Sequence, residues 1–244
     1  MHISPEALDS TTVFVASLSG LVAFGAACRG ARKDLMRSQL PSFLGMTLLV
    51  FLAQIIHFST GFGFSSHLLG GLLMAVLFGP SLAMCSIGLV LIAQVVFLGA
   101  GTWSTLGANF LIMGVLAVGS GYPVFHMLGG SRTIGFNLVQ LLVFAASVIA
   151  SVAVSSTFAF LLIGNGFGSI LLSYLFAGSL ELGLFVVLFA VCLGKREYYS
   201  CTVRLPKLLP VAGLCLLAVF LMPFSSDQMD GLEFASAKTI PAED

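Results

Sequence analysis

Long apolar runs separated by short polar stretches make up most of the chain. Eight runs can be distinguished, and most approach or exceed the roughly 20 apolar residues that a membrane-spanning helix needs. The pattern therefore predicts an all-α polytopic membrane protein, with about seven transmembrane helices in its core and one further C-terminal helix. The runs cover residues 12–28, 43–58, 68–78, 82–98, 106–128, 134–163, 170–193 and 208–222.

The third run has fewer than the roughly 20 apolar residues that span a bilayer, so as a segment it would be either short and tilted or extended into its flanking residues. A polar loop precedes it. Residues 59–67 read STGFGFSSH, and two further glycines follow at 70 and 71. Polar, glycine-rich backbone between apolar runs is costly unless it lines a site or faces water. His67, which ends this loop, is therefore the first candidate functional residue, and Ser65 and Ser66 are candidates to support it.

Composition agrees with the membrane interpretation. Hydrophobic residues make up 58% of the chain and charged residues 8%, whereas a soluble domain carries about 25% charged residues. The formal net charge is zero, and we expect no nucleic-acid partner. Residues 1–12 have no basic stretch, so no cleavable signal peptide is predicted. The five cysteines are scattered and are expected to be small core or loop residues.

The basic residues give the predicted orientation, because Lys and Arg favour cytoplasmic loops. If the predicted loop 29–39 is cytoplasmic, alternation over eight segments also places Arg132 and the loop 194–206 there. Nine of the ten basic residues then lie inside, with Lys238 as the exception. The N-terminus, the loop before His67 and the acidic tail 225–244 are then predicted on the outer side.

The first two residues can offer three nitrogens to a metal. The free amine of Met1, the deprotonated amide of His2 and the His2 imidazole would lie in one plane. A distant imidazole would complete a square of four nitrogens, a geometry that favours Ni(II) or Cu(II) over Zn(II), Mg(II) or Ca(II). His67 is predicted on the same side of the membrane. The alternative, a histidine at position 2 without such a role, stays open at this point.

Three further polar residues lie in or beside the apolar runs. His57 is expected either to support the site, as second-shell partner or alternate ligand, or to be an ordinary interfacial histidine. Asn109 could hold the loop or the histidines by hydrogen bonds, or simply cap a helix. Glu181 lies near the middle of its run, where an unpaired charge is costly, so we expect it to make a packing or coupling hydrogen bond rather than to bind metal. The tail acids Asp227, Asp230 and Glu233 either attract cations or are solvated.

Several motifs resemble a known family. They are Met1-His2, SSHLLGG at 65–71, LFGP at 77–80 and LGAN at 106–109. Together, over residues 1–200, they resemble the CbiM/NikM family, the cobalt/nickel substrate-binding components of energy-coupling factor (ECF) transporters. The tail resembles a small accessory component with a Pro-Asp-Gly-Leu-Glu motif, here with Met229 in place of the proline. The resemblance divides the chain into a metal-binding membrane domain, 1–200, and an accessory helix with an acidic tail, 201–244.

The resemblance implies a function and a site. The metal would lie between the N-terminal amine, the amide and imidazole of His2, and the imidazole of His67. Co2+ or Ni2+ would be the transported substrate, with no organic cofactor and no enzymatic activity, and cobalt uptake would serve cobalamin biosynthesis. The implied partners are a membrane coupling (T) protein and two ATPase subunits of an ABC importer in the bacterial cytoplasmic membrane. Family members usually carry Asn-Phe-Pro at positions 57–59 and Gly-Gly-Thr-Ser-Gly-His at 62–67, and these departures leave the identity of the metal open.

Other functional classes would need sequence motifs of their own. No Gly-x-x-x-x-Gly-Lys-Ser/Thr loop is present, so energy for uphill transport would come from partners. A stand-alone permease usually carries His-x-x-x-x-Asp-His, and a membrane metalloenzyme needs a cluster such as His-Glu-x-x-His; neither occurs. A structural or regulatory membrane subunit remains the alternative if the pairing of His2 with His67 is coincidental.

Overall fold

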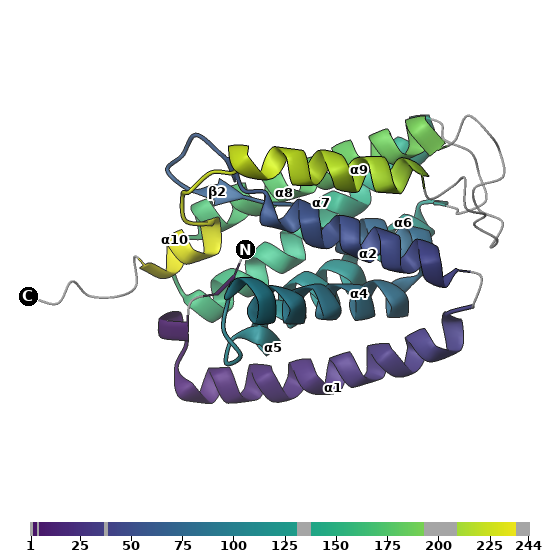
Figure 1. The fold of residues 1–244 in the computed structure, drawn as a ribbon. Coiled ribbons are helices and arrows are strands. Elements are labelled where there is room, and N and C mark those ends of the chain that lie inside the picture. Colours follow the sequence, from purple (N-terminus) through teal and green to yellow (C-terminus); the bar gives the residue numbers. More distant parts are fainter. Residues whose placement is uncertain (1, 4, 37–38, 131–137, 193–208, 238–244) are drawn as a thin grey trace, which may run out of the picture.

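The computed structural model describes residues 2–3, 5–36, 39–130, 138–192 and 209–237, which form a bundle of roughly aligned helices (Figure 1). A two-stranded hairpin and short helical turns are added at one end. The elements are η1 (Pro5–Ala7), α1 (Ser10–Asp34), α2 (Leu40–Ile55), β1 (Phe58–Ser59), β2 (Ser65–Ser66), α3 (Gly71–Phe78), α4 (Pro80–Ala93), η2 (Gln94–Leu98), α5 (Leu106–Phe110), η3 (Leu111–Leu116), α6 (Ala117–Met127), α7 (Leu138–Ile163), α8 (Phe167–Cys192), α9 (Leu209–Leu221), η5 (Met222–Phe224) and α10 (Gly231–Ala237).

The described helices agree with a polytopic membrane protein. Five stretches are long and apolar enough to cross a bilayer: α1, α4 with η2, α5 with η3 and α6, α7, and α8. Helix α2 and residues 212–221 of α9 are shorter apolar helices. Helix α3 has 8 residues, so the third apolar run does not extend into a helix of spanning length. The number of spans and the outward orientation of the N-terminus stay predictions.

The first helix is longer than the apolar run from which it was predicted. The loop expected at 29–39 is wrong over its first half, since α1 continues to Asp34. Its start is fixed by Asp9, whose side chain accepts hydrogen bonds from the backbone of Thr11 and Thr12. Its last turn carries Arg32 and Lys33, which favour the negative end of the helix dipole. At 25 residues α1 is about 37 Å long, so its basic end extends past an apolar layer of about 30 Å.

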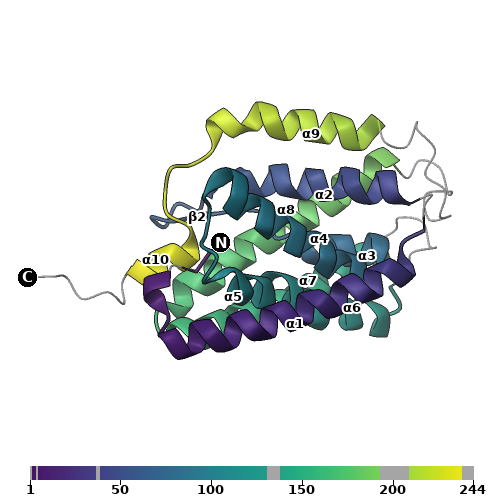
Figure 2. The same ribbon diagram turned by 60° about the horizontal axis from the view of Figure 1, so that its bottom comes forward.

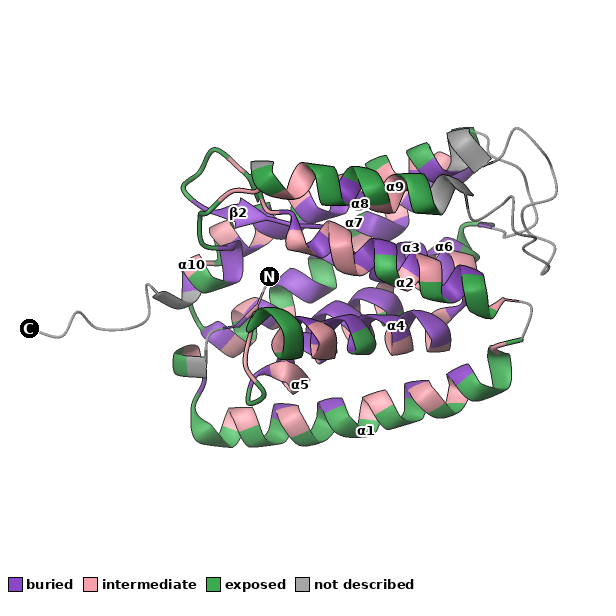
Figure 3. Ribbon diagram, viewed as in Figure 1, coloured by how far each residue is buried: buried purple, intermediate pink, exposed green. Residues whose placement is uncertain are grey.

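Small residues let α1 pack closely on α5. A Cβ atom added to Gly20 would lie 2.6 Å from the Cα of Gly107, and one added to Gly107 would lie 2.5 Å from the Cα of Ser17. The two backbones therefore touch directly, as small-residue contacts between membrane helices allow. The opposite face of α1 is exposed along its length (Figure 3).

The N-terminus, the hairpin and α10 lie together at one end of the bundle (Figures 1 and 2). We call this the histidine end, made of residues 2–3, 57–67 and 225–237. The hairpin pairs Phe58 with Ser66 and Ser59 with Ser65, and its turn uses positive φ angles at Gly61 and Gly63. A parallel bridge joins Ser65 to Asp230, so segments from the start, the middle and the end of the chain meet here.

Candidate metal centre

His67 is fully buried, and its ring contacts the main chain of its own segment. Its Nδ1 lies 2.9 Å from the carbonyl oxygen of Leu68. That contact places the ring proton on Nδ1 and leaves the lone pair on Nε2, the usual arrangement in a metal-binding histidine. Two residues on, the Leu69 carbonyl accepts a hydrogen bond of 2.7 Å from Gln54 of α2, and Gln94 donates to Gln54 at 2.9 Å.

The start of α3, just after His67, is anchored by Glu181. The N–H of Leu73 donates to Glu181 Oε1 at 2.8 Å, across from α8. The first N–H groups of a helix have no partner within the helix, and a carboxylate at that end is also favoured by the helix dipole. Glu181 is buried and joins α8 to the element that follows the loop histidine.

His2 is placed by contacts from distant parts of the chain. Its backbone N–H donates to Asp230 Oδ2 at 2.9 Å, and the N–H of Ile3 donates to Asn109 Oδ1 at 2.9 Å. The Ile3 side chain is buried in the core, with 1% of its surface exposed. Gly101, at φ +76°, faces the His2 ring, and a Cβ atom there would lie 3.2 Å from His2 Nδ1. Glycine at position 101 therefore both adopts the positive φ angle of the turn and leaves room for the His2 ring.

The two histidines singled out from the sequence come close together. The ring centres of His2 and His67 are 6.2 Å apart, and those of His57 and His67 are 5.1 Å apart, edge to face. Two imidazoles that bind one metal through nitrogens at about 2 Å have ring centres at most roughly 6.5 Å apart. Both pairs lie within that upper limit, which applies to rings on opposite sides of a metal. In the predicted square His67 would lie next to the His2 ring, with centres about 4.5 Å apart, so the two rings would move closer as they bind one ion.

Side chains alone do not complete a metal site in the described part of the chain. No three His, Cys, Asp or Glu residues there form a group that could hold an ion. Met1, whose amine is the predicted first ligand, lies outside the described residues. The predicted donor set draws two of its four nitrogens from the main chain, so it needs only two side-chain ligands.

The two serines beside His67 make hydrogen bonds to main-chain oxygens. Ser65 Oγ donates to the Gln228 carbonyl at 2.7 Å, and Ser66 Oγ donates to the Ser173 carbonyl of α8 at 2.8 Å. They thus hold the loop that carries His67. His57 is half-buried; its Nδ1 lies 3.0 Å from the Ile55 carbonyl, and its N–H donates to Ser225 Oγ at 2.8 Å.

Asp230 is the site residue whose position the sequence reasoning missed. Its Oδ1 accepts hydrogen bonds from the N–H groups of Leu232 at 2.8 Å and Glu233 at 3.0 Å, and its own N–H donates to Glu233 Oε2 at 3.3 Å. This is a capping box at the start of α10, and the Asp-x-x-Glu spacing is the signal that could have predicted it. Of the tail acids, Asp227 and Glu233 are exposed, whereas Asp230 is 4% exposed and contacts His2.

The electrostatics favour neutral imidazoles beside an ionised carboxylate. Burial, reinforced by the positive amino terminus, lowers the pKa of His2 to about 3, and the same two causes lower the pKa of His57. Burial alone would raise the pKa of Asp230. The amino terminus, His2 and the backbone hydrogen bonds outweigh burial and hold that pKa below its ordinary value. Neutral imidazole is the form that binds a metal.

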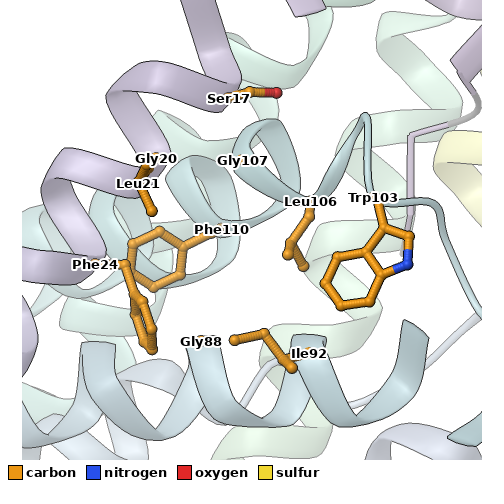
Figure 4. Close-up of a pocket in the computed structure, with 10 residues that line it drawn as sticks. All are labelled: Ser17, Gly20, Leu21, Phe24, Gly88, Ile92, Trp103, Leu106, Gly107 and Phe110. Carbon is orange, nitrogen blue, oxygen red and sulfur yellow. The ribbon is translucent and has the colours of Figure 1, made fainter. Parts of the chain in front are cut away.

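An apolar cavity between α1, α4 and α5 differs sharply from the histidine end. It has a volume of about 410 Å³, and its walls include Leu21, Phe24, Trp103, Leu106 and Phe110 (Figure 4). The Ser17 hydroxyl, which also lines it, donates to the Ser104 carbonyl at 3.0 Å. This lining offers hydrocarbon rather than metal donors.

Comparison with known proteins gives consistent matches. The profile of a family described as the cobalt uptake substrate-specific transmembrane region (CbiM) matches residues 2–219. A Haloquadratum walsbyi protein named for metal transport is 30% identical over 167 residues, covering 66% of this chain and 75% of that protein. The cobalt transport protein CbiM of Sorangium cellulosum is 38% identical over 76 residues, covering 31% of this chain and 32% of that protein. The crystal structure of a truncated transition metal transporter has a similar fold, with a TM-score of 0.55 and 17% identity over 93% of this chain and 100% of that chain.

Proposed function

Because the chain belongs to the CbiM family and is therefore a membrane component of transition metal transport, we propose that it is the substrate-binding component of an ATP-driven ECF importer. Its substrate is Co2+ or Ni2+, captured on the outer side of the cytoplasmic membrane. It works without an organic cofactor and catalyses no reaction of its own.

The observation that carries this proposal is the approach of the His2 ring to the His67 ring at 6.2 Å. In the sequence, α1 and α2 lie between these two residues. Separate sets of hydrogen bonds bring them to the same end of the bundle. The amine of Met1 and the amide of His2 then supply the nitrogens that the side chains lack. Co2+ and Ni2+ both accept nitrogen ligands, and availability decides between them as much as the ligands do.

The metal binds by displacing protons. The His2 amide carries its proton in the structure, since it donates to Asp230, and a metal that takes this nitrogen removes the proton. Affinity should therefore fall in acid. ATP is bound by two ATPase subunits, and a membrane coupling protein transmits the work of hydrolysis, as expected for a chain without a phosphate-binding loop.

The test is to disturb the N-terminal donors alone. Purified full-length protein with one residue added before Met1, or with His2→Ala, should lose Co2+ and Ni2+ binding in calorimetry, because the chelate rings can no longer form. His126→Ala is the matched control. His126 lies in the last turn of α6, at the other end of the helical stretch that begins beside Asn109, and its ring packs on Tyr122 with ring centres 4.6 Å apart.

The control should bind both ions as the wild type does. Unchanged binding in the extended protein and in His2→Ala would refute the metal site and favour a structural or regulatory membrane subunit. Metal uptake by cells that express this chain without the ATPase subunits would instead favour a stand-alone permease.

A further inference from the structure

We infer that Asp230, in the C-terminal tail, is a working part of the metal site: it holds the His2 peptide before capture and balances the charge of the ion afterwards. This inference rests on the proposed function, since it concerns the same site. It assigns to the tail a direct role in binding Co2+ or Ni2+.

The geometry places the carboxylate next to the predicted metal position. Asp230 Oδ2 lies 2.9 Å from the His2 backbone nitrogen. A deprotonated amide nitrogen binds a metal where its proton was, so a metal about 2 Å from the His2 nitrogen would lie on the side of Oδ2. The carboxylate would then draw back by about 1 Å or more, and it would still face the ion. The carboxylate is buried, so water screens its charge only weakly at that range.

The charge of the predicted donor set is incomplete without a carboxylate. The amine and the two imidazoles are neutral when they bind, and the deprotonated amide contributes one negative charge. A divalent ion would thus leave one uncompensated positive charge in a buried place, which is costly. Two acidic side chains are buried in the described part of the chain, Glu181 and Asp230. Glu181 is bonded to the start of α3, and Asp230 faces His2.

When the metal binds, the contact between the His2 amide and Asp230 changes from a hydrogen bond to an attraction between charges. In the metal-free protein the His2 N–H donates to Asp230 and holds the N-terminal peptide at the histidine end. Binding of the metal to that nitrogen removes its proton and hence the hydrogen bond. The carboxylate is then left facing the cation, so attraction between charges replaces the lost bond.

The tail is fixed firmly enough to hold Asp230 there. The N–H of Ser65 donates to the Met229 carbonyl at 2.8 Å, and the N–H of Ser226 donates to the His57 carbonyl at 2.7 Å, so main-chain hydrogen bonds tie the tail to the loop region at two points. Gly231, which follows Asp230, lies so close to α8 that a Cβ atom there would be 2.3 Å from Ser173 Cβ.

The two carboxylate oxygens of Asp230 do different work, which allows the roles to be separated. Oδ1 caps α10, and Oδ2 accepts from His2. Asn is as good a helix N-cap as Asp, so Asp230→Asn keeps the cap but removes the charge and turns an NH2 group toward the His2 N–H. Asp230→Glu keeps the charge but is a poorer cap. A charge role and a capping role therefore predict opposite rankings of these two variants.

The experiment compares Co2+ and Ni2+ affinity by calorimetry in the wild type, Asp230→Asn, Asp230→Glu and Glu233→Gln, with thermal unfolding of each metal-free protein. We expect Asp230→Asn to weaken binding about 10- to 100-fold, the usual effect of losing a residue that supports a metal ligand, with little change in melting temperature. Asp230→Glu should bind more tightly than Asp230→Asn although it unfolds earlier. Glu233→Gln, which removes a neighbouring charge and keeps the capping box, should bind as the wild type does.

Wild-type affinity in Asp230→Asn, or weaker binding in Asp230→Glu than in Asp230→Asn, would overturn the inference. If Asp230→Asn fails to fold, Asp230→Glu decides alone: retained binding supports the charge role and lost binding refutes it. His67→Ala, measured in parallel, separates this inference from the proposed function. Loss in His67→Ala with none in Asp230→Asn rejects only the role of Asp230, whereas wild-type binding in both rejects the site itself.

Discussion

His67 and His2 lie at the same end of the bundle, but they are held there by different means. The His67 segment is fixed by its own hairpin, by the Leu68 carbonyl beside it and by Ser66, which donates to α8. Of the N-terminal residues that the structure describes, His2 and Ile3 each donate one backbone hydrogen bond, and the acceptors, Asp230 and Asn109, come from distant elements. The loop should therefore tolerate loss of any one distant partner, whereas the N-terminal segment should not.

This difference fits the tasks proposed for the two histidines. A rigid, buried imidazole can wait in place for a metal, while the segment that carries the amine and the amide must rearrange its hydrogen bonds as the metal binds. Segments with few and separable contacts open most easily. Three substitutions test this difference. They remove the His67 ring, loosen the N-terminal segment at Asn109, or alter only His57, the neighbour of His67.

The largest effect is expected from His67→Ala. It removes the imidazole proposed to complete the nitrogen square, and no backbone donor can replace it. Because the hairpin and the Ser66 bond remain, the protein should stay folded. We expect Co2+ and Ni2+ affinity to fall more than about 100-fold, which exceeds the usual effect of losing an outer-shell partner, as measured by calorimetry. Affinity close to wild type would show that the loop histidine does not bind the metal.

A smaller effect is expected from Asn109→Ala. The Ile3 N–H would lose its acceptor at a buried position, which costs about 1–3 kcal/mol, or roughly 5- to 150-fold in the population of the docked N-terminus. Metal affinity should fall within that range, and amide hydrogen exchange should rise in the N-terminal segment but not in the loop 58–67.

Asn109→Asp is the matched control, because a carboxylate keeps an acceptor oxygen toward Ile3. It should restore slow exchange at Ile3. Equal acceleration of exchange in the loop and in the N-terminal segment would contradict the view that the two are held independently.

The sequence could predict the parts of this arrangement that follow from local pattern. Apolar runs predicted the helices, and the polar break before α3 pointed to His67 because a buried loop needs a reason. The N-terminal donor set also follows from the chemistry of two adjacent residues, and it stays a prediction because Met1 lies outside the described residues. The sequence also indicated that Glu181 would need a partner, since it lies in an apolar run.

The remainder depends on pairing between distant segments, which leaves little trace in a single sequence. The bridge from Ser65 to Asp230 is made largely through the main chain, and main-chain hydrogen bonds do not select side-chain types. The sequence therefore left the tail acids as either cation-attracting or solvated, and it could not show that Asp230 is buried. Nor could the sequence show that Glu181 would meet the N–H of Leu73, because that contact requires α8 to pack on the start of α3.

The smallest effect is expected from His57→Phe. The His57 ring packs edge to face on the His67 ring, with centres 5.1 Å apart, and its Nδ1 contacts the Ile55 carbonyl. Phe keeps the aromatic contact, which is worth about 0.5–1.5 kcal/mol between rings, and gives up one hydrogen bond of similar size. Metal affinity should therefore change by less than roughly tenfold, well short of the loss in His67→Ala. If His57→Phe instead abolished binding as His67→Ala does, His57 would be a ligand, and the loop region would supply two imidazoles to the metal rather than one.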